Sequence, residues 1–152
     1  MPKIDVAALS FVARGGYPPP HDNLVAGRSR KRLGDEVGLT QFGVNLTKIA
    51  PGGLSSLRHW HDNQDEFVYV LDGALILVEN EGETILRAGE AAGFKAGVAN
   101  GHHLVNRSDR DAVYLEIGAR TARERAHFPD VDLAVVVDET GVRYSRKDGS
   151  PV

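Results

Sequence analysis

The sequence predicts an all-β fold, and three observations support this class. Short runs of aromatic, β-branched and other apolar residues alternate with polar positions, as in strands that are buried on one face. Clusters of Gly, Asn, Asp and Pro interrupt these runs about every 8 to 12 residues, a spacing typical of sandwiches and barrels. No stretch of helical period is long enough to separate the strands, which excludes a βαβ arrangement.

The expected strands begin at residues 41–49, where apolar and polar residues alternate. Pro51-Gly52-Gly53 interrupts the pattern, and a new strand is expected after it because Pro and Gly break regular pairing. The remaining elements follow in this order: a histidine strand and its hairpin partner 66–73, a hairpin of 74–78 and 83–86 around the turn 79–82, strands at 104–105 and 113–117, a short helix at 121–126, and a terminal pair of strands, 131–137 and 142–145, around 139–141.

The length and composition indicate one domain. A chain of 152 residues is long enough to bury a single hydrophobic core. The chain contains no cysteine, which removes disulfides, thiolate ligands and a cysteine nucleophile and fits a reducing compartment. No apolar segment approaches the roughly 20 residues that span a bilayer. We therefore expect a cytoplasmic protein without a membrane partner.

The N-terminal residues are expected to form an arm. The apolar run 6–13 follows Asp5 and ends at Arg14 without a clear small-residue cleavage site, so we interpret it as an arm or edge strand rather than a signal peptide. Residues 14–27 contain three consecutive prolines, which favour an extended segment and prevent a helix. This segment is expected to cross the surface of the protein or of a partner.

The charge pattern argues against a nucleic-acid partner. The formal net charge is -3, and the basic run Arg28-Ser29-Arg30-Lys31-Arg32 is local. An electrostatic footprint for nucleic acid normally covers a whole surface. We therefore interpret this run as a solvated face, with contact to phosphate as the less favoured alternative.

Residues 53–73, GLSSLRHWHDNQDEFVYVLDG, contain most of a metal site. Successive side chains of a strand point to opposite faces and each residue advances about 3.3 Å, so His59 and His61 project to one side, roughly 6.6 Å apart, and Trp60 to the other. The polar turn that follows brings Glu66 back beside the two histidines. Imidazole and carboxylate ligands together suit Zn, Fe, Mn, Ni or Cu.

This segment resembles the first motif of the cupin superfamily, G-x5-H-x-H-x4-E-x6-G, at all five fixed positions. The resemblance implies a cupin jelly roll, or double-stranded β-helix, in which two sheets enclose a cavity. It covers residues 40–118, the predicted cupin core. An N-terminal arm with an edge strand (1–39) precedes this core, and a C-terminal extension with extra strands (119–152) follows it, packed on the barrel or on a partner.

Residues 89–106 resemble the second cupin motif, G-x5-P-x-G-x2-H-x3-N, with departures. Lys95 stands at the proline position, and two additional residues precede the histidine. His102 lies four residues before Asn106 and is therefore the implied fourth ligand. Adjacent strand residues face opposite sides, so His103 is expected to point outward. The insertion can shift this phase, which leaves His103 as the alternative ligand.

The resemblance implies that His59, His61, Glu66 and His102 hold one divalent transition metal, of the class Zn, Fe, Mn or Ni. Three imidazoles and one carboxylate leave two positions of an octahedral ion open to water or substrate. Such an ion acts as a Lewis acid, generates hydroxide or, if it is redox-active, binds dioxygen.

Two functions therefore remain open at this point. The first is a metal-binding single-domain cupin that acts on a small polar metabolite, such as a sugar, sugar phosphate or hydroxy acid, as an isomerase, oxygenase or decarboxylase if it is an enzyme. The alternative is a non-catalytic cupin that binds and senses a small molecule. Fold and ligand set alone do not decide between them.

Several other residues receive structural interpretations. Glu90 and Glu116 are candidates for a general base by residue type only, and each is equally well explained as a surface or loop residue. His127 is interpreted as a surface or hydrogen-bonded histidine. Trp60, Phe67 and Tyr69 are interpreted as packing residues, with an aromatic wall for a substrate as the less favoured alternative.

A homodimer is the expected assembly. A small jelly roll exposes sheet edges, which natural proteins cover or pair. The N-terminal arm, the C-terminal strands, or both are expected to extend a sheet of the partner. The alternative is that these segments fold back on their own barrel.

Overall fold

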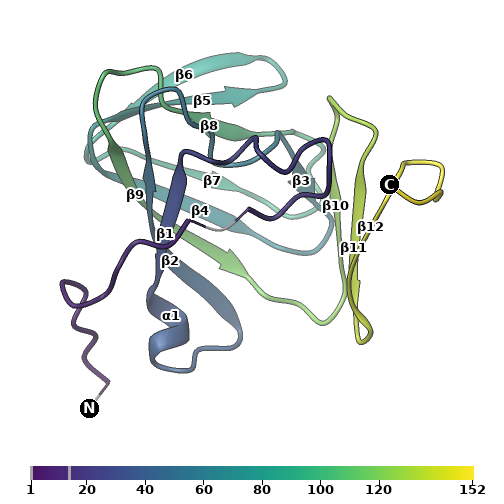
Figure 1. Cartoon of the computed structure of the whole chain (residues 1–152), viewed down its shortest axis with the longest axis horizontal. Helices are drawn as coiled ribbons and strands as arrows, with labels where there is room; N and C mark the ends of the chain where they lie inside the picture. Colours follow the sequence, from purple (N-terminus) through teal and green to yellow (C-terminus); the bar gives the residue numbers. More distant parts are fainter. Residues whose placement is uncertain (1, 14) are drawn as a thin grey trace.

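The computed structural model describes residues 2–13 and 15–152, and within them the chain is built almost entirely of antiparallel strands (Figure 1). The predicted arm and loop also include residues 1 and 14, which lie outside the described residues. The elements are β1 (Arg28–Arg32), α1 (Leu33–Glu36), β2 (Phe42–Ile49), β3 (Trp60–His61), β4 (Glu66–Asp72), β5 (Ala74–Glu79), β6 (Gly82–Arg87), β7 (Ala91–Phe94), β8 (His103–Val105), β9 (Ala112–Ala119), β10 (Glu124–His127), β11 (Ala134–Asp138) and β12 (Gly141–Ser145).

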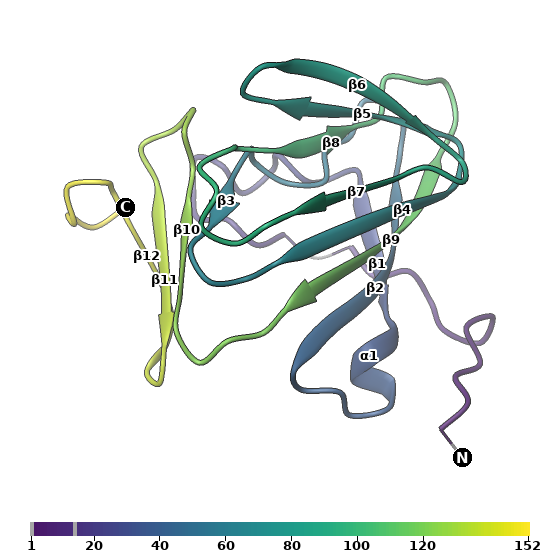
Figure 2. The same ribbon diagram turned by 180° about the vertical axis from the view of Figure 1, so that it is seen from behind.

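Three sheets make up the fold. A five-stranded sheet has the order β1-β2-β9-β4-β7, a three-stranded sheet the order β6-β5-β8, and a four-stranded sheet the order β12-β11-β10-β3. Figures 1 and 2 show the first two sheets facing each other, with the β10–β12 strands standing at one end. This arrangement confirms the predicted all-β jelly roll with an N-terminal arm and additional C-terminal strands.

The core lies between the two facing sheets, because strand alternation turns one set of side chains inward. In β4, Val68 and Val70 are buried while Phe67 and Tyr69, on the opposite face, are exposed. The interpretation of Phe67 and Tyr69 as packing residues is therefore wrong within this chain. The main core combines residues of both sheets: Ile49, Val68, Val70, Leu75, Leu77, Leu86, Leu104, Ala112 and Tyr114. A smaller cluster lies beside the C-terminal sheet: Leu57, Ala126, Phe128, Leu133 and Val135.

The hairpins with clear turn residues are found where they were expected. β5 and β6 pair around Asn80-Glu81, and β11 pairs with β12 around Glu139-Thr140. Gly141 has a φ of 109°, a conformation that glycine adopts without the strain of a side chain. The four-residue helix α1 was not expected, since its sequence is too short to show a helical period.

Two local expectations are wrong, and one strand pairing accounts for both. Residues 121–126 were expected to begin a helix, but Glu124–His127 form strand β10. β10 pairs with β3, placing Ala126 opposite His61, whereas β4 pairs with β7 and β9. The histidine strand therefore has the C-terminal strand, not β4, as its partner, and tertiary pairing overrides the local helical preference of residues 121–126.

The basic run 28–32 is also not a solvated face. It forms edge strand β1, which pairs with β2, and its alternate residues point inward. Arg28 is only 7% exposed and Arg30 is half-buried. Composition alone indicated a surface, but pairing in the sheet decides the direction of these side chains.

The two terminal segments lie differently. The C-terminal strands extend a sheet of their own chain through the β10–β3 pairing. In the N-terminal arm, Val12 forms an isolated bridge with Arg30, and Phe11 and the Val6 carbonyl contact Lys31 of β1. The first residues of the chain extend beyond these contacts (Figure 1). Among the described residues, no helix has the length and apolar character needed to cross a membrane.

Asn106 is fully buried and supports the loop between β8 and β9. Its Nδ2 donates to the carbonyl oxygens of Ile49 and Arg110, each at 2.8 Å, and its Oδ1 accepts from the Ser108 amide at 3.0 Å. Asn106 is therefore a structural polar residue of this loop.

We expect Asn106→Ala to lower the free energy of unfolding by roughly 2 to 4 kcal/mol, because it leaves buried carbonyl groups without a donor. Urea unfolding monitored by circular dichroism measures this change. The control is Asn23→Ala at an exposed position, which should stay within about 0.5 kcal/mol of wild type. Equal stability of the two variants would contradict a structural role for Asn106.

Candidate metal centre

Three histidines and one glutamate meet at the inner end of the barrel. His61 lies in β3, Glu66 is the first residue of β4, and His59 and His102 directly precede β3 and β8. The backbones of His59 and His102 form an isolated antiparallel bridge, with N–O distances of 3.2 and 3.0 Å. Opposite residues of an antiparallel pair project to the same face, so the bridge sets these two imidazoles side by side.

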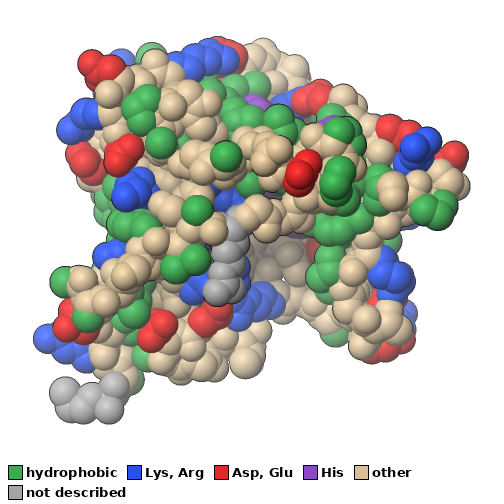
Figure 3. Space-filling model, viewed as in Figure 1, with side chains coloured by type: hydrophobic (Ala, Val, Ile, Leu, Met, Phe, Trp, Pro, Cys, Tyr) green, Lys and Arg blue, Asp and Glu red, His purple; other side chains and the backbone are tan. Residues whose placement is uncertain are grey.

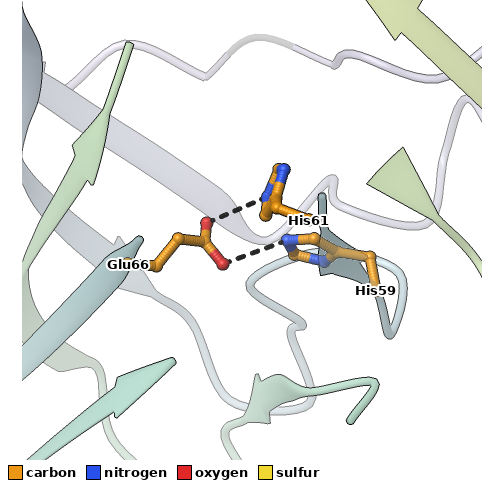
Figure 4. Close-up of side chains that lie close together, drawn as sticks. All are labelled: His59, His61 and Glu66. Carbon is orange, nitrogen blue, oxygen red and sulfur yellow. Dashed lines mark ion pairs between the residues drawn. The ribbon is translucent and has the colours of Figure 1, made fainter. Parts of the chain in front are cut away.

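Glu66 is the common partner of the imidazoles. Its Oε1 lies 3.3 Å from Nε2 of His61, and its Oε2 lies 3.5 Å from Nε2 of His59. Figure 4 shows the carboxylate reaching between these two rings from the opposite strand. Nε2 of His102 is 2.7 Å from the same Oε2. For His59, His61 and Glu66, one ligand atom from each lies within 4.8 Å of the other two, a grouping that could hold a metal ion.

The hydrogen bonds on the far side of two rings fix their tautomers. Nδ1 of His59 lies 2.8 Å from the carbonyl oxygen of Leu57, and Nδ1 of His102 lies 3.0 Å from that of Asn100. A carbonyl oxygen only accepts, so each Nδ1 carries a proton, and a neutral ring then keeps its lone pair on Nε2. This is the usual arrangement of an imidazole that ligates a metal.

The donor set fits a cation on physical grounds. Unprotonated Nε2 atoms facing a carboxylate place lone pairs against lone pairs, and that contact requires a positive charge between them. Protons on the rings or a metal ion meet this requirement. A set of imidazole nitrogens with one carboxylate is the chemistry that divalent transition metals prefer.

The charge states within the cluster are coupled. Burial raises the pKa of the Glu66 carboxyl, but hydrogen bonds from His102, His59 and His61 lower it more, and the net pKa lies well below its usual range. Burial lowers the pKa of His59, while the hydrogen bond to Glu66 and its charge bring the net pKa above the ordinary value. Glu66 is therefore an anion throughout the physiological pH range.

His102, rather than His103, faces the cluster. The ring of Phe94 stacks on His102, with centroids 3.6 Å apart and planes 2° from parallel, which holds the imidazole in place. Nδ1 of His103 lies 2.8 Å from the carbonyl oxygen of Ser56, so this side chain is turned from Glu66 although it is half-buried. The role of the four side chains as ligands stays a prediction.

The sequence did not indicate Glu124, a buried carboxylate beside the cluster. Its Oε1 lies 3.8 Å from Nδ1 of His61 and accepts a hydrogen bond from the backbone amide of Asp62 at 2.9 Å. The separation of 3.8 Å is longer than a hydrogen bond, and Nδ1 of His61 has no hydrogen-bond partner among the described residues, so Glu124 contributes negative charge beside the ring without fixing its orientation. Glu124 lies in the segment expected to be helical, and without the β10–β3 pairing nothing in its sequence context points to His61.

Trp60 points away from the cluster, as strand alternation predicts. Its ring stacks on that of His127, with centroids 3.9 Å apart, and Nε2 of His127 lies 2.8 Å from a carboxylate oxygen of Asp62. The interpretation of His127 as a hydrogen-bonded residue is thus confirmed.

His59, Glu66 and His102 line a cavity of about 410 Å³, and His61 lines a second cavity of about 220 Å³ that shares Glu66 and His102 with the first. Figure 3 shows a hollow on the face of the molecule seen in Figure 1, with Lys and Arg side chains beside it. Of the two glutamates considered as bases, Glu116 lines the first cavity and Glu90 is exposed and bonded to the Arg87 amide. Arg28 and Arg30, which the sequence suggested were at the surface, also line it. In the sequence, the only sign that Arg28 and Arg30 share a face was their two-residue spacing within a possible strand.

Comparisons with known proteins agree with this geometry. The family model described as Cupin domain matches residues 45–118. No curated protein matches the chain. Among solved structures, the chain is similar to a sugar phosphate isomerase from a cupin superfamily of Silicibacter pomeroyi, with 47% identity, a TM-score of 0.94, and coverage of 99% of this chain and 96% of the other.

Two further structures are similar over different lengths. A candidate sugar phosphate isomerase of Acidithiobacillus ferrooxidans has 23% identity and a TM-score of 0.84 over 99% of this chain and 96% of its own, a likeness of fold alone. The cupin domain of an XRE family transcriptional regulator of Enterobacter cloacae has 26% identity and a TM-score of 0.51 over 62% of this chain and 98% of its own.

We expect the chain to bind one divalent metal ion and His102→Ala to lose this binding, while His103→Ala keeps it. At a free metal concentration of about 100 times Kd, the ion should stabilise the wild-type protein by roughly 2.7 kcal/mol. Elemental analysis after dialysis and thermal unfolding with and without metal measure both effects. Loss of metal in His103→Ala with retention in His102→Ala would reverse the assignment of the fourth ligand.

Proposed function

Because the chain belongs to the cupin superfamily, we propose that it is a metal-dependent enzyme that isomerises a sugar phosphate. The observation that carries this proposal is the cluster of three imidazoles and Glu66, of which His59, His102 and Glu66 line a cavity of about 410 Å³. The similar structure from Silicibacter pomeroyi, described as a sugar phosphate isomerase, supports the reaction class. The lack of cysteine supports a reducing, cytoplasmic location for this activity.

The chemistry of the site suits a hydroxy-carbonyl substrate. A divalent ion held by His59, His61, Glu66 and His102 would supply a Lewis acid that polarises a carbonyl oxygen and acidifies the neighbouring C–H bond. The protein residues provide binding and orientation: the hydrogen bonds to the carbonyl oxygens of Leu57 and Asn100 fix two of the rings. The barrel walls restrict the access of water to the substrate.

We expect metal-loaded wild-type protein to interconvert an aldose phosphate and its ketose isomer. His102→Ala should lower kcat/KM more than roughly a hundredfold, because the loss of a metal ligand is more damaging than the loss of a hydrogen bond that supports a ligand. A coupled assay or NMR over a panel of triose to hexose phosphates measures this, with His21→Ala, remote from the cluster, as the control. Metal-loaded protein that turns over none of these compounds would exclude the isomerase.

A non-catalytic sensing cupin is the second candidate. The similarity to the cupin domain of a transcriptional regulator favours it, as does the two-residue insertion before His102, which alters the loop at the site. The panel that tests the isomerase also separates the two functions. Binding of a panel compound, seen by calorimetry, without any turnover would favour the sensing function.

We further propose that the protein acts as a homodimer through the outer face of the five-stranded sheet, which Figure 2 shows turned to the viewer. Register places Val44, Ile117 and Phe67 in one apolar row across β2, β9 and β4. A parallel row contains Leu46, Leu115 and Tyr69. Five strands of about seven residues present roughly 550 Å², less than the roughly 800 Å² per partner of a standard interface. The N-terminal arm lies against the same sheet, where Phe11 contacts Lys31 and Lys48, and its exposed side can supply the difference, which favours a second copy as the partner.

We expect wild-type protein to be dimeric at micromolar concentration and Tyr69→Asp to be monomeric, because the variant places a charge within the apolar face. Light scattering after gel filtration measures the mass. Ile85→Asp is the matched control, since Ile85 is 46% exposed but lies on β6 of the other sheet. A monomeric wild type, or equal dissociation of both variants, would contradict this interface.

A further inference from the structure

The edge strand β1 places two arginines inside the barrel. Arg28 and Arg30 are two residues apart, so their side chains leave the strand on the same face, and both line the cavity that contains the metal cluster. Arg28 is buried, and its Nη1 contacts the backbone oxygen of Ser55. Barrel interiors are normally apolar, and burying a guanidinium is costly unless its charge is matched.

One carboxylate partly matches these two charges. Nε of Arg30 lies 2.6 Å from Oε1 of Glu116, and its Nη2 lies 3.2 Å from Oε2. Asn45 Nδ2 and the Tyr114 hydroxyl donate to the same carboxylate at 2.9 and 3.0 Å. Glu116 is therefore engaged on both oxygens and is held as an acceptor. Two guanidinium groups against this carboxylate leave a net positive charge on the β1 side of the cavity.

The mutual effects of these groups agree with an excess of positive charge. Burial lowers the pKa of Arg28, and the charge of Arg30 lowers it further, so the two cations are near enough to repel each other. The negative charge of Glu116 raises the pKa of Arg28, but by less than burial and Arg30 lower it. An additional anion between the two guanidinium groups would relieve this repulsion. A guanidinium has five N–H donors in a fork that matches the oxygens of phosphate. Glu116 occupies only some of the N–H donors of the Arg30 guanidinium.

The arginines and the metal cluster are separated by a distance that a small substrate can span. Glu66 lies opposite Gly118 on β9, two residues beyond Glu116, so Glu116 and Glu66 are diagonal neighbours at about 7 to 8 Å. Because Arg30 contacts Glu116, its guanidinium lies on the order of 10 Å from the imidazoles. A sugar phosphate with its carbonyl end at Glu66 would reach the arginines with its other end.

We propose that Arg28 and Arg30 form an anion subsite that binds the phosphate group of the substrate, in the cavity that His59, Glu66 and His102 also line. The identification of this anion as part of a sugar phosphate rests on the proposed function. The binding of a phosphate anion by the two arginines is independent of that function. The subsite gives the cavity two different ends, one that holds the phosphate and one that holds the reacting oxygen, and so fixes the direction in which the substrate enters.

The experiment measures phosphate binding to the full chain by calorimetry, both metal-free and metal-loaded, because phosphate can also bind a metal. Removing Arg30 alone would leave Glu116 as an uncompensated buried charge. The informative variants are therefore Arg28→Gln and the double variant Arg30→Gln/Glu116→Gln. Lys31→Gln is the control, since it removes a positive charge from the outer face of the same strand, where Lys31 contacts Phe11 and the Val6 carbonyl.

We expect inorganic phosphate and a sugar phosphate to bind wild-type, metal-free protein, with at least about tenfold weaker binding to Arg28→Gln and to the double variant, and less than about twofold change in Lys31→Gln. An unphosphorylated sugar should not compete with inorganic phosphate. Circular dichroism and metal content verify that each variant is folded. Unchanged phosphate affinity in both folded variants, or equal loss in Lys31→Gln, would overturn the subsite.

Failure of the isomerase and failure of the subsite are distinguishable. If the chain is not an isomerase, no sugar phosphate is turned over, but metal-free protein still binds phosphate through the arginines. If the arginines do not form the subsite, wild-type turnover persists and KM for the sugar phosphate is the same in Arg28→Gln. If both are correct, KM rises at least about tenfold in Arg28→Gln while metal content stays at one ion per chain.

Discussion

The site depends on a buried carboxylate enclosed by imidazoles. Glu66 stands at the start of β4 with Nε2 atoms of three histidines around it at 2.7 to 3.5 Å. Backbone carbonyls fix two of these rings with their lone pairs toward the carboxylate, and such an arrangement is stable only with a positive charge in its centre. The bridge between His59 and His102 and the stacking of Phe94 on His102 hold this geometry. The surrounding barrel is the scaffold that keeps these segments, distant in sequence, in contact.

The cavity has a polar asymmetry that follows from strand alternation. The five-stranded sheet turns Arg28 and Arg30 inward on the edge strand β1 and Glu66 inward on the fourth strand, β4, with Glu116 on β9 between them. The same alternation turns apolar side chains such as Leu115 and Tyr69 outward. The inner face thus carries a few charged side chains beside the apolar core, and the outer face carries exposed apolar side chains, two features on which the proposed ligand and the proposed dimer respectively depend.

The sequence predicted the fold and the members of the cluster because both depend on local patterns. The spacing of His59 and His61 matched strand geometry, the cupin motif added Glu66, and the spacing to Asn106 favoured His102. The hairpin expected to bring Glu66 beside the histidines does not form, since β3 pairs with β10 and not with β4. The pattern could not reveal Glu124 or Arg30, whose positions depend on which strands pair. β3 pairs with β10 across more than sixty residues of sequence, and the direction of Arg30 is set by pairing between β1 and β2. Such long-range pairings also overrode the helical preference of residues 121–126.

The position of Glu124 bears on where the functional unit ends. The family match stops at residue 118, yet this carboxylate reaches His61 from β10, and three backbone amides of the turn after β3 and of β10 itself hold it there. A chain cut after residue 118 would retain every candidate ligand and still lose the carboxylate behind His61 together with the strand that pairs with β3. The segment matched by the family model is thus shorter than the segment that surrounds the cluster, because β10 supplies the pairing partner of β3.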